Sequence, residues 1–279
     1  MNARLTIFAV LPGAGAVPAV IAAHQALFPS NGGKLIGVMV NPVVVSNSIP
    51  SELILPSFIE AQLAANQRGL EEAQAEFLRA CKEVGIAGEW RTSQIASMGV
   101  SGRAGALARA ADLVIAPALP VEQSVGRHEL DQLVFESGRP VLALPVDWTS
   151  ASLGKRVVIA WNGKREAARA VFDALPILTQ AAAVRVVSVR ESAHDNLGQF
   201  TPGDEIAGTL ARHGVPVDTI AVHCEKESIA QEIRAQAAEY GADLIVMGCY
   251  GHSRFREMIL GGVTREMTNE LSMPVLMSS

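Results

Sequence analysis

The chain carries the same sequence pattern twice, and this repeat restricts its fold more than any other feature. Residues 111–115 read ADLVI and residues 242–246 read ADLIV, and each is followed by a Pro-Val-Leu segment, at 139–142 and 273–276. Because such self-similarity marks duplicated structural units, we predict two domains of the same fold in tandem.

A change of composition separates the two copies. The apolar run at 141–146 gives way to a segment that contains Ser, Thr and Gly, and a second apolar run begins at Arg156. Turn-forming residues between periodic segments are typical of a connection. We therefore expect domains at 1–146 and 155–279, joined by a linker at 147–154.

Within the second copy, short β-branched runs alternate with segments of helical periodicity. The expected strands lie at 156–161, 184–189, 217–222, 243–247 and 274–277, and the expected helices at 164–179, 204–213 and 226–240. Alternating units of this length form a parallel sheet with helices on both faces. The predicted fold class is α/β, with two doubly wound, Rossmann-like parallel-sheet domains whose ligand sites lie beyond the carboxyl ends of the strands.

The first copy contains one long helix, expected at about 57–84. Leu63, Leu70, Phe77 and Val84 recur every seven residues along it. This spacing is compatible with a coiled-coil partner, but it spans too few heptads to specify one. We expect these side chains to pack against the sheet.

Composition excludes several classes of partner. Lys and Arg number 23 against 28 Asp and Glu, and aromatic residues make up 5% of the chain, so the sequence has neither a basic phosphate footprint nor a base-stacking platform. The longest apolar stretch, at 35–45, is too short to span a bilayer. Three cysteines are too few for a disulfide framework. We expect a cytoplasmic protein that binds neither nucleic acid nor membrane.

Residues 4–11 admit two interpretations. An Arg followed by an apolar run resembles the hydrophobic region of a secretory signal. The same pattern recurs at 156–161, where we expect a buried strand, and Pro12 with Gly13 ends the first run. We therefore favour a buried strand at 4–11 as well.

The segment most informative about function is 247–266, which lies between an expected strand and an expected helix near 263–264. Gly248 and Gly251 allow the backbone to bend tightly and to approach a ligand. A helix that begins after 261–262, another pair of glycines, presents free N–H groups to an anion. The alternative is that these glycines only shape turns. Glycines at both ends of one loop, at the carboxyl end of a strand, favour phosphate binding.

The spacing of these glycines is similar to that of a known family. The pattern Gly248-x2-Gly251-x9-Gly261 resembles the nucleotide loop of the universal stress protein family, with a likeness over essentially all of 155–279 and a weaker one over 1–146. The resemblance implies the adenine-nucleotide alpha hydrolase-like form of the Rossmann fold. It also implies a stress-response regulatory protein that binds ATP or another adenine nucleotide in its C-terminal domain, with Mg²⁺ as a candidate companion ion.

Carried over position by position, the resemblance implies a nucleotide site. Its expected members are Asn162, Gly163, Val189, Met247, Gly248, Gly251, Gly261, Gly262, Val263 and Thr264. Arg254, inside the loop, joins them because a guanidinium pairs well with phosphate, although a solvated loop is an equal alternative for this residue. Asn162 stands where the family usually has Asp, and Gly262 stands where it usually has Ser or Thr. One charge and one hydroxyl donor are therefore missing, and Thr264 is the nearest substitute for the hydroxyl.

The first copy lacks this loop. After its fourth expected strand the chain reads APALP at 116–120, without either glycine of the phosphate loop. Gly13-x-Gly15-x-x-Pro18 resembles a dinucleotide fingerprint, but Pro stands at its third position and no acidic residue follows the next strand. We expect the first copy to be a degenerate, structural domain.

Motifs of other enzyme classes do not occur in the sequence. It contains neither Gly-x4-Gly-Lys-Ser/Thr nor Gly-x-Ser-x-Gly. A metal site from 223–224 (His-Cys) and Cys249-x2-His252 would need two strand ends to converge, and the spacing matches no recognised zinc pattern. No residue is an evident general base, so we assign no catalytic residue or metal ligand and do not expect efficient ATP hydrolysis.

Two other functions stay open at this stage. One is an interaction protein that binds no nucleotide, and the other is a slow ATPase or phosphotransferase. The resemblance further implies that the closing strands of the two copies pack together, as in dimers of the family. A homodimer of the whole chain and an unidentified protein partner are also expected.

Overall fold

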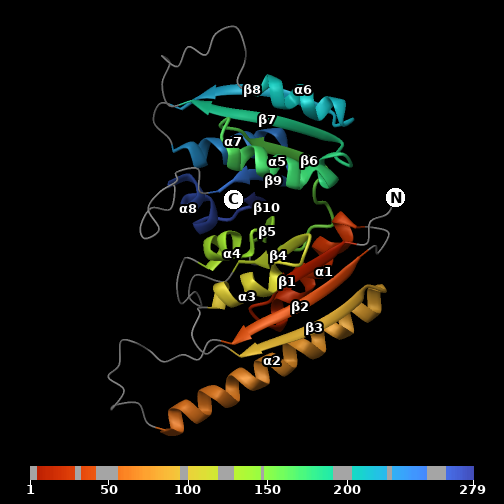
Figure 1. The fold of residues 1–279 in the computed structure, drawn as a ribbon, viewed down its shortest axis with the longest axis vertical. Helices are drawn as coiled ribbons and strands as arrows, with labels where there is room; N and C mark the ends of the chain where they lie inside the picture. The colour runs from red at the N-terminus through yellow and green to blue at the C-terminus, as the bar shows by residue number, and fades with distance from the viewer. Residues whose placement is uncertain are drawn as a thin grey trace.

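One mixed sheet lies between two layers of helices (Figure 1). The computed structural model describes residues 5–28, 33–41, 56–94, 100–118, 129–145, 148–190, 203–224, 228–249 and 262–279. Within these residues the sheet has ten strands, in the order β3-β2-β1-β4-β5-β10-β9-β6-β7-β8. The fold is therefore the expected doubly wound α/β class.

The first half of the chain contributes five of these strands. They are β1 (Thr6–Val10), β2 (Lys34–Asn41), β3 (Ala87–Gln94), β4 (Leu113–Pro117) and β5 (Val141–Leu144). The helices of this half are η1 (Ala14–Ala16), α1 (Val17–Leu27), α2 (Pro56–Val84), α3 (Val100–Ala108) and α4 (Glu129–Ser137). The apolar run that follows Arg4 is thus a strand, β1, paired with β2 and β4.

The second half repeats this succession of elements. Its strands are β6 (Arg156–Ala160), β7 (Ala183–Arg190), β8 (Val217–His223), β9 (Leu244–Gly248) and β10 (Val275–Ser278). Its helices are α5 (Arg165–Leu178), α6 (Asp204–Arg212), α7 (Ile229–Tyr240) and α8 (Gly262–Asn269). Each lies within a few residues of the range expected from the sequence.

The two halves meet along one antiparallel strand pair. Counted from β8, the second half has the order β8-β7-β6-β9-β10, which repeats the order β3-β2-β1-β4-β5 of the first. Every pair inside a half is parallel, whereas β5 and β10 run antiparallel with Leu142 opposite Leu276. The expected contact between the closing strands is therefore confirmed, and the two sheets are continuous.

Side-chain alternation along the strands produces two cores. On β1, Ile7 belongs to the core covered by α1, α2, α5 and α6, whereas Phe8 belongs to the core covered by α3, α4, α7 and α8. Both side chains are fully buried, because a parallel sheet with helices on each face has no solvent-exposed side. This arrangement leaves the strand ends as the accessible edges.

The long helix α2 packs against the sheet over only part of its length. Phe77 is fully buried and lies with its ring centroid 5.5 Å from that of Trp90 on β3. Leu63, two heptads earlier, is 50% exposed, and Figure 1 shows that end of α2 extending past the strands. The expectation that all four heptad positions pack on the sheet was wrong for Leu63, because the helix is longer than the sheet edge that it covers.

Candidate functional site

The candidate site lies at the carboxyl ends of three neighbouring strands, β9, β6 and β7. Ala160, the last residue of β6, is in register with Met247 on one side and with Val187 on the other. The residues that follow Ala160 therefore lie beside the end of β9, where Gly248 is. Val189 lies two residues beyond Val187, near the end of β7. The sequence-predicted positions from these three strands thus share one edge of the sheet.

Asn162 and Gly163 form the turn between β6 and α5. The Asn162 Oδ1 atom accepts a hydrogen bond from the backbone N–H of Lys164 at 3.0 Å, and Gly163 has φ +71°. A side chain that binds the backbone two residues later, followed by a residue in the left-handed region, is a turn that favours Asn and Gly. Lys164 is the N-cap of α5 and supplies no side-chain cap. This exposed turn therefore leaves the start of α5 open at the edge of the sheet.

Gly248 contacts the first turn of α5. A Cβ atom at this position would lie 2.4 Å from both the carbonyl carbon of Glu166 and the backbone N of Ala167. Real Cβ atoms do not approach backbone this closely, so only glycine fits between β9 and α5. Our sequence analysis explained Gly248 by the approach of a ligand. The contact with α5 is sufficient to require the glycine.

Glu166 is a charged residue at this edge that sequence analysis missed. Its side chain is 7% exposed, and its Oε1 atom lies 2.5 Å from Nε of Arg165. Burial raises the pKa of the Glu166 carboxyl, but the hydrogen bond from Arg165 and the residue's own backbone N–H outweigh burial, so the pKa lies below its usual value. The burial of Glu166 could have been predicted from the sequence, because Glu166 stands four residues before Ala170 and so lies on the buried face of α5.

The start of α8 forms the other side of the candidate site. Gly262 is exposed and has open space where a Cβ would lie, and Val263 is half-buried. Thr264 is 4% exposed and Met247, on β9, is 3% exposed. The side chains of Thr264 and Met247 therefore face the protein interior, which leaves their backbone as the part that a ligand could reach.

Polar contacts hold α8 against α7. The Oε1 atom of Glu266 accepts from the Ser228 hydroxyl at 2.5 Å and from Arg234 at 3.4 Å. Ser228 is also the N-cap of α7, in a capping box with Gln231. Arg234 reaches Glu270 at 3.1 Å as well. These contacts hold the second turn of α8 against α7.

The centre of the glycine-rich segment lies outside the described residues. This applies to Gly251, Arg254 and Gly261, which belong to 250–261. The predicted contacts of these residues with phosphate therefore stay predictions. The described members of the site are those in the turn after β6, on β7, on β9 and on α8.

The strand order argues against the metal hypothesis, of which one residue, His252, lies outside the described residues. Cys224 follows β8 and Cys249 follows β9, and these strands are separated by β6 and β7. Three steps of about 4.8 Å place the strand ends roughly 14 Å apart, too far to share an ion. Across the residues that the structure describes, no group of three or more His, Cys, Asp and Glu side chains could hold a metal. None of the described helices is long and apolar enough to cross a membrane.

Sequence comparison finds a family match over the second half. Residues 154–279 match the model of the universal stress protein family. The universal stress protein Slr1230 of Synechocystis sp. is 24% identical over 153 residues, which cover 53% of this chain and 49% of that protein. The chain thus matches about half the length of this curated relative.

Structural comparison extends the likeness to the whole chain. A universal stress protein from Archaeoglobus fulgidus DSM 4304 superposes with a TM-score of 0.70 at 14% identity, covering 100% of this chain and 97% of that one. A functionally unknown protein from Pseudomonas aeruginosa PAO1 gives 0.58 at 14% identity, over 99% and 93% of the two chains. At this identity the structures show a shared fold, with both halves included.

Proposed function

We propose that the protein binds an adenine nucleotide at the candidate site and regulates a stress response, because residues 154–279 match the model of the universal stress protein family. The match includes every position of that site, from Asn162 to Thr264. The nucleotide would be ATP or a close relative, with Mg²⁺ as its companion.

One observation carries the proposal: an exposed helix start faces open space at the site. Gly262 begins α8 and is exposed, and among the described residues no atom lies within 4 Å of the position that a Cβ would take. The first N–H groups of a helix lack partners within the helix, and the helix dipole favours an anion there. We assign the phosphates to this helix start and to Gly251 and Gly261 in the preceding segment.

The other strand ends would hold the nucleoside. Val189, half-buried near the end of β7, would contact the adenine, and the exposed turn at Asn162 and Gly163 would lie beside the sugar and base. Lys164 and Arg165, both exposed at the start of α5, add positive charge on the same edge.

The proposal also covers the domain organisation of the chain and its cellular compartment. The two domains would be 1–146 and 155–279, with the linker at 147–154, and only the second would bind nucleotide. All three cysteines are buried and none of them is in a disulfide, which supports a reducing compartment such as the cytoplasm. We also propose that the chain forms a homodimer and binds a protein partner.

The test begins with the nucleotide content of freshly purified protein and continues with thermal unfolding during titration with ATP and Mg²⁺. Ligand at a hundred times its dissociation constant adds about 2.7 kcal/mol to stability, which raises the melting temperature by several degrees. Gly261→Val should abolish this shift. Gly15→Ala is the matched control, because it lies after β1 of the first half and its Cβ would meet open space.

A non-nucleotide interaction protein is the second candidate function, and Glu166 favours it. Its carboxyl is ionised and buried in the first turn of α5, and this negative charge opposes a second anion there. The absence of both bound nucleotide and a thermal shift at millimolar ATP would establish this alternative. ATP hydrolysis that disappears in Gly261→Val would instead make the protein a slow ATPase.

A further inference from the structure

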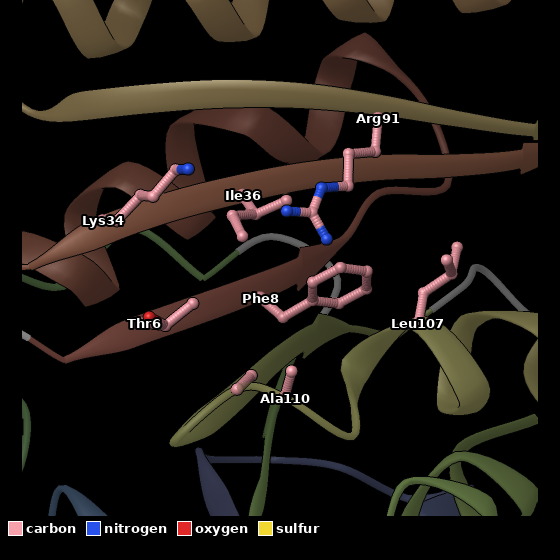
Figure 2. A pocket seen from close by; sticks show the side chains of 8 residues that line it. Thr6, Phe8, Lys34, Ile36, Arg91, Leu107 and Ala110 are labelled. Atoms are coloured by element: carbon pink, nitrogen blue, oxygen red, sulfur yellow. The ribbon is translucent and has the colours of Figure 1, made fainter.

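A cavity lies on the first half of the sheet, between α3 and the amino ends of β1 and β2. Its volume is about 230 Å³. Its apolar lining consists of Leu107, which is half-buried, and of Phe8 and Ile36, which are 1% and 4% exposed, and Lys34 and Arg91 stand at the rim. Figure 2 shows the Arg91 guanidinium extending from β3 across β2 toward Phe8. The cavity therefore combines an apolar surface with positively charged side chains.

The second half fills the corresponding place with its own side chains. The ring of Tyr240, at the end of α7, lies between two guanidinium groups, with Arg156 at 4.5 Å and Arg185 at 4.2 Å from its centroid. Arg185 also pairs with Asp218, at 2.8 Å. A guanidinium over an aromatic face is an attractive arrangement, strongest where water is excluded.

Backbone hydrogen bonds establish which residues correspond. Thr6 donates its N–H to the carboxylate of Asp112 and accepts from the Asp112 N–H, and Arg156 makes the same two bonds with Asp243. Thr6 therefore corresponds to Arg156. Counted back from these aspartates, Arg109 corresponds to Tyr240.

The strand registers also show which of these side chains the first half lacks. Ile36 is in register with Glu89 on the neighbouring strand, as Arg185 is with Asp218. Ile36 therefore stands in the place of Arg185, one of the two arginines that contact the Tyr240 ring. Arg109, in the place of the tyrosine, is directed away to α4, where it bonds to the carbonyl oxygen of Glu136 at 3.1 Å. The aromatic ring and both of its guanidinium partners are thus absent from the first half, and the cavity occupies their place.

The charge at the rim is a single positive one. Lys34 and Arg91 both pair with Glu89, Arg91 through Nε at 2.6 Å. The hydrogen bond from Lys34, and then that from Arg91, lowers the pKa of the Glu89 carboxyl, so this group is ionised at neutral pH. Two cations and one anion leave one unit of positive charge, which a monoanion would balance.

We propose that this cavity binds a small monoanion with a single aromatic ring, of the aromatic carboxylate class. The ring takes the place that Tyr240 occupies in the other half, against Leu107 and beneath the Arg91 guanidinium. The carboxylate pairs with Arg91 and Lys34, because a planar guanidinium matches a carboxylate in geometry. The volume is below the roughly 300 Å³ at which pockets for larger ligands begin, which limits the ligand to one ring.

This site is separate from the proposed nucleotide site. Thr6 and Lys34 are the first residues of β1 and β2, so the cavity lies at the amino end of the sheet. The candidate nucleotide site lies at the carboxyl ends of β6, β7 and β9. Failure of one proposal therefore leaves the other unaffected.

The experiment is calorimetric titration of the full chain with sodium benzoate. We expect saturable binding at one site, with a dissociation constant on the order of 0.1–1 mM, as suits a ligand of this size. Arg91→Gln should weaken binding by about tenfold or more, because a charge-assisted hydrogen bond is lost. Glu89→Gln should strengthen binding several-fold, because it removes the competing carboxylate and raises the local charge.

Two controls separate the proposed site from general anion binding. Benzamide, a neutral molecule of nearly the same shape, should bind at least about tenfold more weakly than benzoate. Arg185→Gln, the corresponding loss of a guanidinium in the second half, should leave the affinity for benzoate unchanged. The proposal is overturned if benzoate does not bind at about 10 mM, if Arg91→Gln binds like the wild type, or if Arg185→Gln weakens binding equally.

Discussion

Gly248 and Glu166 are 82 positions apart in the sequence and touch in the fold, since a Cβ at 248 would lie 2.4 Å from the Glu166 carbonyl carbon. The contact joins the end of β9 to the first turn of α5. The same turn of α5 carries the Glu166 carboxylate, which is 7% exposed. A glycine typical of a nucleotide loop is therefore also a packing requirement of the sheet.

Gly248→Ala should destabilise the protein by about 1–3 kcal/mol, because either β9 or α5 must move to admit the methyl group. Gly262→Ala, with open space around the added Cβ, should change stability by no more than about 0.5 kcal/mol. Urea unfolding followed by circular dichroism measures both. Equal stability of the two variants would contradict the packing role of Gly248.

Local patterns in the sequence were enough to predict the elements, and the duplication was enough to predict their order. The expected strand at 217–222 and the expected helix at 164–179, for example, match β8 and α5 closely. Contacts between elements were not predictable in the same way. The role of Gly248 depends on the backbone of Glu166, and the cavity at Arg91 depends on side chains that are missing compared with the other half. Neither relation leaves a local pattern in the sequence.

Gly262→Ser should strengthen ATP binding if the proposed function holds. The family usually has a hydroxyl residue here, and the open space at Gly262 accommodates the side chain without displacing a neighbour. One added hydrogen bond to an anionic phosphate is worth about 1.5–3 kcal/mol, which corresponds to at least a tenfold lower dissociation constant. Titration calorimetry measures the change. An unchanged affinity for ATP would place the phosphates elsewhere than at the start of α8.

Asp243→Ala should cost more stability than Asp112→Ala, although the two residues correspond in the repeat. The carboxylate of Asp243 accepts from the N–H groups of Lys155 and Arg156 and from the hydroxyl of Ser152, at 2.6 to 3.1 Å. That of Asp112 accepts from the N–H of Thr6 at 2.7 Å.

With about 1 kcal/mol for each additional bond, the difference in unfolding free energy should be about 2 kcal/mol. Chemical denaturation of both variants under identical conditions gives this difference. A larger loss for Asp112→Ala would show that the hydrogen bonds of the carboxylates do not determine their contribution.

His24 should make the protein sensitive to acid. Its side chain is fully buried in α1, and neither ring nitrogen has a hydrogen-bond partner among the described residues. Burial lowers the pKa of His24 from 6.5 to about 4. The unfolded chain therefore takes up a proton at a higher pH than the native protein does. The stability that neutral His24 provides is complete above pH 6.5 and is lost as the pH falls toward 4.

The gap between the two pKa values of His24 corresponds to about 3 kcal/mol of stability. Between pH 7 and pH 4, the free energy of unfolding should decrease in the wild type. In His24→Leu this decrease should be smaller, by about 3 kcal/mol. His24→Gln is the matched variant, since it keeps a polar group but cannot be protonated, and it should show the same reduced pH dependence. Urea unfolding at several pH values measures all three proteins. Parallel pH profiles for the wild type and both variants would exclude His24 as the source of acid sensitivity.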